Sequence, residues 1–428
     1  MSRKALILAA FAALLAGPCC AAPRDDVAEI AQLISSYYFD AARGSAIAAD
    51  LKRDAAKGAF DHLTDHYDFA AAMTARLRPL DTHFNVRWVG AQAKPGAPES
   101  AGAALQMSTE DAERRTNYGF GRTERLPGNI AYIDLRYVAD IDFTQKASPS
   151  RRAANTALVS AAGADAVILD LRQNGGGAPS MVGYIVSAFV PANADVYNTF
   201  HSRTGEDSER PGQNFANPML QVPLYVLTSA RTGSAAEAIA FTLQSCGRAT
   251  VVGDRSAGAA NPGERFGTEH GYSVFVSTGA SINPINHRNW EGTGVQPDTE
   301  VPAASALIRA QEFALQKVLH GKAGAPVKLD AQWALDALHV TQYPYKPSSL
   351  EQYSGRFGIY SMQIESGRLL AHWDRRIPML LVPLSRDVFF VEGDPGRRFQ
   401  FLRAGGAIAA LEVRTSTGLF FQHINKTV

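Results

Sequence analysis

One continuous stretch, QVPLYVLTSARTGSAAEAIAFTL from Gln221 to Leu243, constrains the fold of this chain more than any other. It opens with a short apolar run rich in strand-forming residues, Val222 to Leu227, and closes with alanine-rich sequence suited to a helix. A tight turn, Ser229 to Gly233, separates the two and leads directly into Ser234. A strand, a sharp turn and a helix place Ser234 in the first helical turn. Free backbone N–H groups and the helix dipole can stabilise a developing oxyanion there.

Ser234 has two interpretations at this point. The segment Ser234-Ala-Ala-Glu237 matches a capping box, in which the serine caps the helix and the glutamate reaches back to the cap. The other interpretation is a catalytic nucleophile, which needs partners elsewhere in the chain.

A second strand, loop and helix precede this stretch. The near-continuous apolar run Ala166 to Leu171 predicts a buried strand of the parallel type. The glycine-rich loop Arg172 to Gly177 follows it, and a helix follows from about Pro179 to Val190. Such a loop presents backbone N–H groups to an anion. It matches neither nucleotide-binding glycine motif, which leaves an oxyanion hole or a simple tight turn.

Strands and helices alternate through the middle of the chain, which predicts a parallel or mixed sheet with helical cover. Further strands are expected at 130–135, 249–252 and 273–277, and helices at 235–243 and 303–319.

The composition argues against nucleic-acid binding, and the N-terminal sequence indicates a cellular location. The 428 residues carry a formal charge of +1 and are 46% hydrophobic, with no long basic block for nucleic acid. Residues 1–22 resemble a cleaved secretory signal: Arg3 and Lys4 precede a short apolar run, and small residues lead to Ala22. We expect a secreted or periplasmic protein with no membrane span after cleavage.

The three cysteines are relevant to the expected location and to disulfide formation. Cys19 and Cys20 raise the alternative of a lipoprotein, which Pro18 disfavours because a small residue is expected before the modified cysteine. After cleavage only Cys246 remains, so no internal disulfide is expected.

Residues 25–89 show helical periodicity and contain three histidines of interest. His62 and His66 are four residues apart and could face a metal from one helix side, but no third ligand is evident nearby, and the alternative is a solvated face. We expect no metal and no cofactor. His83 lies between a predicted helix and a predicted strand, and Glu291 lies in a turn-rich loop from Asn289 to Asp298.

The C-terminal part differs in kind. Short alternating runs predict a small antiparallel barrel or sandwich, at 356–360, 369–373, 379–382, 388–391, 398–402, 409–413 and 419–422. The predicted organisation is a signal peptide at 1–22, a helical subdomain at 23–90, a linker at 91–125, an α/β domain at 126–320, a linker at 321–345 and a β domain at 346–428.

Four motifs together resemble peptidase family S41, in the order DLRQNGGG from Asp170, TGSAAE from Thr232, GRATVVG from Gly247 and GVQPD from Gly294. The resemblance covers about Asp25 to Ser305. It implies an α/β fold of the ClpP/crotonase type, a mixed sheet with helical cover, beside the N-terminal helical subdomain and the C-terminal β domain. No PDZ-like segment is visible between the helical region and the sheet.

The resemblance also assigns residues. Ala259 stands where the processing proteases of the family have a lysine base, so the Ser–Lys dyad is absent. The tricorn-like branch uses Ser, His and Glu instead, which implies Ser234 as nucleophile, His83 as base and Glu291 as orienting acid. Thr82 falls where that branch has a supporting hydroxyl, and the implied oxyanion donors are the N–H groups of Gly177 and Ala235.

The function implied is a serine endopeptidase acting on peptides or unfolded proteins, with the oligomeric state open. The alternative is a non-catalytic protein that binds a lipid or retinoid-like ligand in a hydrophobic pocket, as some relatives with this fold do. A third interpretation is a scaffold whose C-terminal β domain binds a partner or glycan.

Overall fold

The computed structural model describes residues 23–90 and 109–427. The predicted signal peptide, and residues 91–108 of the predicted linker, lie outside the described residues. The described residues divide into two compact units: the first holds residues 23–90 together with Ser202–Thr204 and Gly263–Gly279, and the second holds the remainder. Within the described residues, no helix is both long and apolar enough to cross a bilayer.

The first unit packs three helices against a small antiparallel sheet. The helices are α1 (Pro23–Tyr37), α2 (Ala41–Ala56) and α3 (His66–Leu77), and the strands are β1 (Asn85–Trp88), β9 (Gly263–Gly267) and β10 (Tyr272–Ser277). The strand order is β1-β10-β9. Asp40 and Asp65 accept hydrogen bonds from the first turns of α2 and α3, as N-cap residues do. The sequence analysis grouped 263–279 with the α/β domain, whereas these residues belong to the first unit.

The second unit is built on a six-stranded sheet in the order β12-β8-β7-β4-β3-β2. Its strands are β2 (Phe120–Leu126), β3 (Ile130–Leu135), β4 (Ala166–Asp170), β7 (Leu224–Thr228), β8 (Thr250–Gly253) and β12 (Thr299–Glu300). Only the β2–β3 pair is antiparallel within this sheet. The predicted mixed sheet is therefore confirmed.

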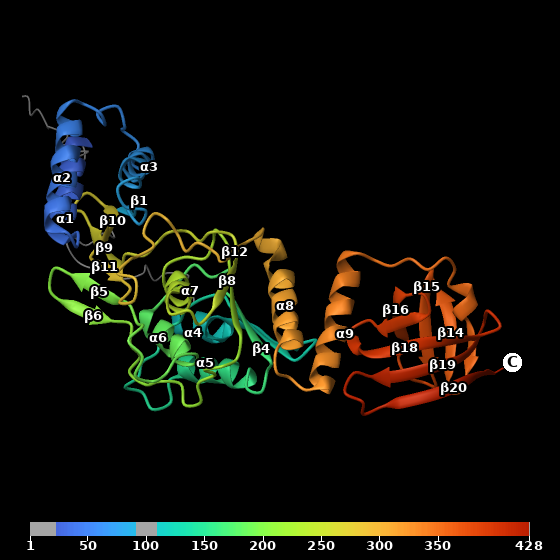
Figure 1. Cartoon of the computed structure of the whole chain (residues 1–428). Helices are drawn as coiled ribbons and strands as arrows, with labels where there is room; N and C mark the ends of the chain where they lie inside the picture. The colour runs from blue at the N-terminus through green and yellow to red at the C-terminus, as the bar shows by residue number, and fades with distance from the viewer. Residues whose placement is uncertain (1–22, 91–108, 428) are drawn as a thin grey trace, which may run out of the picture. The chain divides into compact units, whose positions relative to one another are not determined.

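Helices cover both faces of this sheet (Figure 1). They are α5 (Pro149–Ser160), α6 (Pro179–Ser187), α7 (Ala235–Ser245), α8 (Ala303–His320) and α9 (Ala325–Gln342), and the short helix α4 (Thr109–Arg115) precedes β2 along the chain. Successive side chains of β4 alternate between the two covers. Val167 and Leu169 pack in the cluster that contains Ile239 of α7, and Ile168 packs in the cluster that contains Ala310 of α8. This two-sided burial explains the continuous apolar run in the sequence.

The remaining short elements are η2 (Asn117–Gly119), β5 (Thr199–Ser202), β6 (Glu206–Ser208), β11 (Gly279–Ile282) and η3 (Glu351–Tyr353). They belong to the second unit, except for Ser202 of β5 and Gly279 of β11, which belong to the first.

The C-terminal residues form a closed barrel of eight antiparallel strands (Figure 1). They are β13 (Gly355–Phe357), β14 (Tyr360–Glu365), β15 (Arg368–Trp373), β16 (Met379–Ser385), β17 (Val388–Val391), β18 (Asp394–Ala404), β19 (Ala407–Thr415) and β20 (Phe421–Thr427). The run 356–360, expected as one strand, forms two strands. Phe357 pairs with Tyr360 across a two-residue turn whose first residue, Gly358, has φ 51°.

Residues 325–342, inside the expected 321–345 linker, form the 18-residue helix α9. Its alanine-rich sequence favours a helix, and proline at its start has the fixed φ that a first helical turn needs. Ala331, Ala334 and Leu335 pack with Leu315 of α8, so α9 extends the cover of the sheet.

Candidate active site

Ser234 lies at the junction between β7 and α7 in an unusual backbone conformation, with φ 51° and ψ −122°. Few non-glycine residues adopt a positive φ, and such strain concentrates at functional sites. A Cβ added to Gly176 would lie 2.7 Å from the Cβ of Ser234, and Gly176 itself has φ 114°. The glycine-rich loop after β4 therefore packs its bare backbone directly against Ser234, and only glycine fits there.

The turn before Ser234 is tied to the loop after β4 by buried polar groups. Thr232 Oγ1 donates to the carbonyl of Leu171 at 2.8 Å, and the Gly233 N–H donates to the carbonyl of Asn174 at 3.0 Å. The fully buried Asn174 side chain also donates to the carbonyl of Leu135, the last residue of β3, at 3.0 Å. These bonds join the carboxyl ends of three neighbouring strands, the edge where α/β sheets bind ligands.

An ion pair fixes the start of the glycine-rich loop. Arg172 Nη2 lies 2.5 Å from Asp170 Oδ2, and Arg172 Nη1 donates to the carbonyl of Ala303 at 2.6 Å. Tyr132 donates its hydroxyl proton to Asp170 at 2.7 Å. Burial, followed by the neighbouring Asp170 carboxylate, raises the pKa of Tyr132, so its hydroxyl remains a donor. The motif residues Asp170 and Arg172 thus hold the loop in place.

Glu237 and Ser234 form the capping box that the sequence suggested, and the Ser234 N–H donates to Glu237 Oε2 at 2.8 Å. The capping role covers only part of what Glu237 does. This fully buried carboxylate also accepts hydrogen bonds from the Ser256 hydroxyl (2.5 Å), the Gly258 N–H (2.7 Å) and the Ala259 N–H (2.9 Å). It therefore connects the backbone of Ser234 to the loop that carries Ala259.

Glu291 holds the next part of the same loop. Its Oε2 accepts from the N–H groups of Ala260 at 2.8 Å and Asn261 at 3.0 Å. Four consecutive N–H groups, at 258–261, therefore donate to the two carboxylates. The buried Glu237 and the half-buried Glu291 thus hold this loop through backbone hydrogen bonds, as expected of buried polar groups.

The two predicted oxyanion donors have uncommitted N–H groups. Neither the Gly177 nor the Ala235 N–H donates to another group in the part of the chain described here. Val138 forms a parallel bridge with Gly177 and bonds to the residues on either side, Gly176 at 3.0 Å and Ala178 at 2.7 Å. In that ladder pattern the Gly177 N–H points away from Val138 and is available to a ligand.

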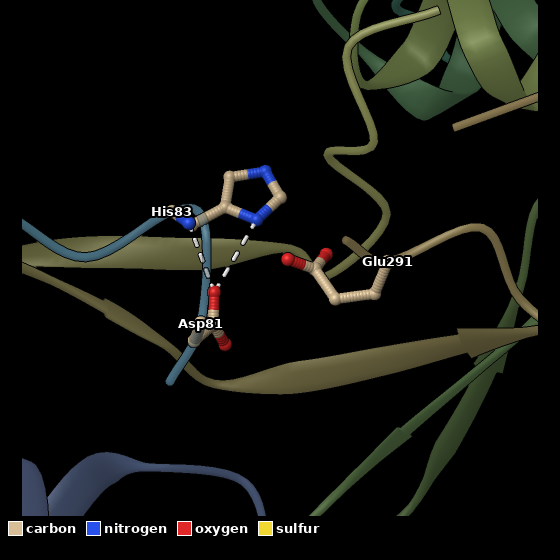
Figure 2. A group of neighbouring side chains, drawn as sticks. All are labelled: Asp81, His83 and Glu291. Carbon is tan, nitrogen blue, oxygen red and sulfur yellow. Dashed lines mark hydrogen bonds and ion pairs between the residues drawn. The ribbon is translucent and has the colours of Figure 1, made fainter. Parts of the chain in front are cut away.

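His83 belongs to the first unit, where Asp81 orients it. The His83 backbone N–H donates to Asp81 Oδ1 at 2.9 Å, and its Nδ1 lies 3.7 Å from the same oxygen. Figure 2 shows both atoms facing that oxygen. Tyr38 donates to the other carboxylate oxygen at 3.2 Å, and the Asp81 side chain is only 1% exposed.

Burial opposes ionisation of Asp81, but the interactions with His83 and Ser277 outweigh it and lower the pKa of Asp81 to about 2. The carboxylate beside His83 is therefore charged at neutral pH. Such a carboxylate fixes the imidazole's orientation and stabilises its protonated form. The half-buried Thr82 lies between these two residues in sequence.

The structure brings some predicted residues together within one unit. Ser234, Ala235 and Gly177 lie around the same junction in the second unit, and Glu291 holds a loop that Glu237 joins to that junction. Thr82 and His83 lie in the first unit.

Sequence reasoning missed Asp81 and assigned Glu237 only a capping role. Asp81 precedes His83 by two residues, the spacing at which an aspartate accepts from a backbone N–H in an Asx turn, so a local signal was present. Three of the four bonds to Glu237 come from residues about twenty positions away, which no local pattern reports.

Curated relatives match the central part of the chain. The carboxyl-terminal-processing protease of Picosynechococcus sp. is 29% identical over 176 residues, covering 41% of this chain and 38% of that protein. The carboxyl-terminal-processing protease of Synechocystis sp. is 32% identical over 139 residues, covering 32% of this chain and 31% of that protein. The matched region thus spans little more than a third of these relatives at most.

Among solved structures, a candidate peptidase from Parabacteroides merdae is 18% identical, with a TM-score of 0.48, and covers 69% of this chain and 98% of its own. The family model for peptidase family S41 matches residues 129–301. That range contains all four motifs on which the resemblance was based, so the resemblance is confirmed. Residues 129–301 of this chain are therefore similar to peptidase family S41.

Proposed function

We propose that this chain is a serine endopeptidase that hydrolyses peptide bonds through an acyl-enzyme on Ser234. The observation that carries the proposal is the strained conformation of Ser234 between a strand and a helix, with a glycine loop packed against it. A helix cap alone does not require a positive φ, because cap residues normally lie in the β region. The match to peptidase family S41 supports the same chemistry.

In the proposed reaction His83 removes the hydroxyl proton of Ser234 as the oxygen attacks the substrate carbonyl carbon. The N–H groups of Gly177 and Ala235 donate hydrogen bonds to the carbonyl oxygen, which now carries the negative charge. The tetrahedral intermediate collapses, the C–N bond breaks, and His83 returns its proton to the leaving amine. Water then attacks the ester with the same base, which releases the acid and restores Ser234.

Orienting groups complete the proposed site. Asp81 holds the His83 imidazole, with the contacts described above, and keeps a negative charge next to the imidazolium that forms. We assign Thr82 and Glu291 to positioning within the site, as the family resemblance implies. The proposed location is the periplasm or the cell exterior, following the signal-like sequence of residues 1–22.

A fluorophosphonate probe tests the nucleophile. We expect the wild-type chain to be labelled and to cleave an unstructured protein, and Ser234→Ala to do neither while it remains folded. Ser160→Ala, in the last turn of α5, is the matched control and should keep both activities. If Ser234→Ala is labelled as wild type is, the assignment is wrong. If wild type neither labels nor cleaves any of a broad substrate panel, the non-catalytic ligand-binding alternative becomes the better account.

A further inference from the structure

A pocket of about 620 Å³ lies beside the first residues of the edge strand β2, in the same unit as Ser234. Its wall is formed by α4, by the turn η2, by the start of β2 and by the residues that follow β3. The residues that matter for its chemistry are Ala112, Arg115, Phe120, Gly121, Arg136 and Tyr137. The proposed peptide hydrolysis at Ser234 assigns no role to this pocket.

The wall of the pocket connects directly to the glycine-rich loop. The Arg136 N–H donates to the carbonyl of Gly119 at 2.8 Å, which ties the turn η2 to the segment after β3. Tyr137 lines the pocket, and the next residue, Val138, donates to the carbonyl of Gly176 at 3.0 Å. Gly176 is the residue packed against Ser234. A peptide lying across Ser234 could therefore reach the pocket with a side chain of a neighbouring residue.

Three polar side chains of the wall, those of Thr116, Asn117 and Arg136, are already bonded within the protein. Thr116 Oγ1 donates to the carbonyl of Ala112 at 3.1 Å, and Asn117 Nδ2 donates to the carbonyl of Phe120 at 3.1 Å. Arg136 Nε donates to Asp134 at 2.8 Å. A polar ligand would gain little from groups that are bonded in this way, whereas an apolar ligand loses nothing.

The wall of the pocket contains two aromatic side chains that can contact an apolar ligand. The Tyr137 side chain lies in the wall with the residue 42% exposed, so part of its ring is accessible to a ligand. Phe120 lies in the same wall and is 2% exposed. Burial, followed by the charges of Asp140 and Glu110, raises the pKa of Glu113 in the wall, which disfavours an additional acidic group.

The turn that shapes the pocket is strained. Asn117 and Tyr118 are consecutive non-glycine residues with φ 49° and φ 54°. Left-handed conformations of such residues cost free energy and persist where the surroundings impose them, most often at ligand sites. The Asn117 side-chain bond to Phe120 and the pairing of Gly119 with Arg136 supply that constraint.

We propose that this pocket is a specificity subsite that takes a large apolar side chain, leucine or phenylalanine, from an extended peptide whose scissile bond lies at Ser234. This inference rests on the proposed peptidase function. The pocket selects which peptide is held across Ser234, and it contributes no group to the chemical step.

The test uses a set of otherwise identical unstructured peptides in which one position at a time is Gly, Ala, Leu or Phe. Wild type should cleave the best Leu or Phe peptide at least tenfold faster, in kcat/KM, than its Gly counterpart. Ala112→Phe fills the pocket and Tyr137→Ala removes its wall, and each should reduce that preference to about threefold or less. In both variants, kcat/KM for the Gly peptide should differ from the wild-type value by less than twofold. Tyr343→Ala removes a tyrosine that is 78% exposed outside the pocket and should keep the wild-type preference.

Two further measurements separate this inference from the peptidase proposal. If Ser234 is labelled by the probe but both pocket variants keep the wild-type preference, the subsite is wrong and the peptidase proposal stands. If no form of the protein is labelled, the peptidase proposal fails, and anisotropy of labelled peptides on Ser234→Ala decides the subsite. Equal affinity for Leu, Phe and Gly peptides there would overturn it, whereas tighter binding of the Leu or Phe peptide, lost in Ala112→Phe, would support it.

Discussion

The buried carboxylate of Glu237 provides the sharpest test of how the candidate site is held together. Each of its two oxygens accepts two hydrogen bonds: Oε1 from Ser256 and Gly258, Oε2 from Ser234 and Ala259. In Glu237→Gln one oxygen becomes an NH₂ group, which faces at least one N–H donor. One or two buried donors lose their acceptor, at a cost of roughly 1–3 kcal/mol each. We therefore expect the free energy of unfolding to fall by about 2–5 kcal/mol.

Glu300→Gln is the control, because it makes the same chemical change at an exposed glutamate in β12 of the same sheet. We expect its loss of stability to stay below about 1 kcal/mol. The assay is urea unfolding followed by near-UV circular dichroism, with fluorophosphonate labelling on the same preparations.

The two variants should differ in labelling as well as in stability. Glu237→Gln should label at least tenfold more slowly at a temperature where it remains folded, because the Ser234 backbone loses its anchor. Equal unfolding midpoints for Glu237→Gln and Glu300→Gln would refute the reasoning, since the hydrogen bonds to the Glu237 carboxylate would then not contribute to stability.

Three further predictions concern Glu209, Asp81 and the position at which the α/β domain ends. Burial raises the pKa of Glu209 to about 8 against an ordinary value of 4.5, so the folded state keeps a proton that the unfolded state releases. Stability should therefore fall between about pH 4.5 and pH 8, by up to about 5 kcal/mol, and melts of Glu209→Gln should lack this fall whereas those of Glu300→Gln should keep it. Asp81→Asn should lower the rate of peptide cleavage at least tenfold with the protein still folded, and an unchanged rate would remove Asp81 from the site. Truncation after Gln342 should leave soluble protein that labels, whereas truncation after Lys322 should not; soluble, labelled protein from the shorter chain would contradict this.

Much of the fold follows from local sequence patterns. The apolar run at 166–170 is long enough for one strand and apolar at every position but the last, so a strand buried on both faces is the natural interpretation. The barrel strands were predicted from alternation, and six of the seven runs each correspond to one strand. The exception, at 356–360, fails because alternation does not register a two-residue turn.

The strand pairing in the sheet of the first unit could not be predicted from the sequence. Periodicity indicates that Tyr272–Ser277 is a strand but does not say which sheet it joins. Its partner β1 is almost two hundred residues earlier, and the register joins Asn85 to Phe275. Pairing at that distance is decided by the burial of side chains such as Val274 with those of α1 and α3, which is a property of the folded unit.

The candidate site shows the same division between local and distant signals. Ser234, Gly177 and Ala235 were identified because each lies in a motif whose strand, loop and helix are contiguous in sequence. The bonds that fix them come from residues such as Asn174 and Glu237, whose side chains reach other segments. A sequence pattern shows that a buried polar residue is present, but its partners emerge only when the segments are folded together.

Helix α9 shows how packing changes a domain boundary drawn from composition. The break at Gly321 to Gly324 suggested that the α/β domain ended there, but Ala331 and Ala334 of α9 are buried with Leu315 of α8. Opposite that contact, Asp336 pairs with Arg398 of β18 at 2.5 Å, and the Arg398 guanidinium lies 4.3 Å from the Trp333 ring centre. Apolar contact joins α9 to the sheet, and a charged, partly exposed contact joins it to the barrel. Because apolar burial contributes most to folding and partly exposed ion pairs contribute little, α9 belongs energetically to the α/β domain, and the boundary falls after Gln342.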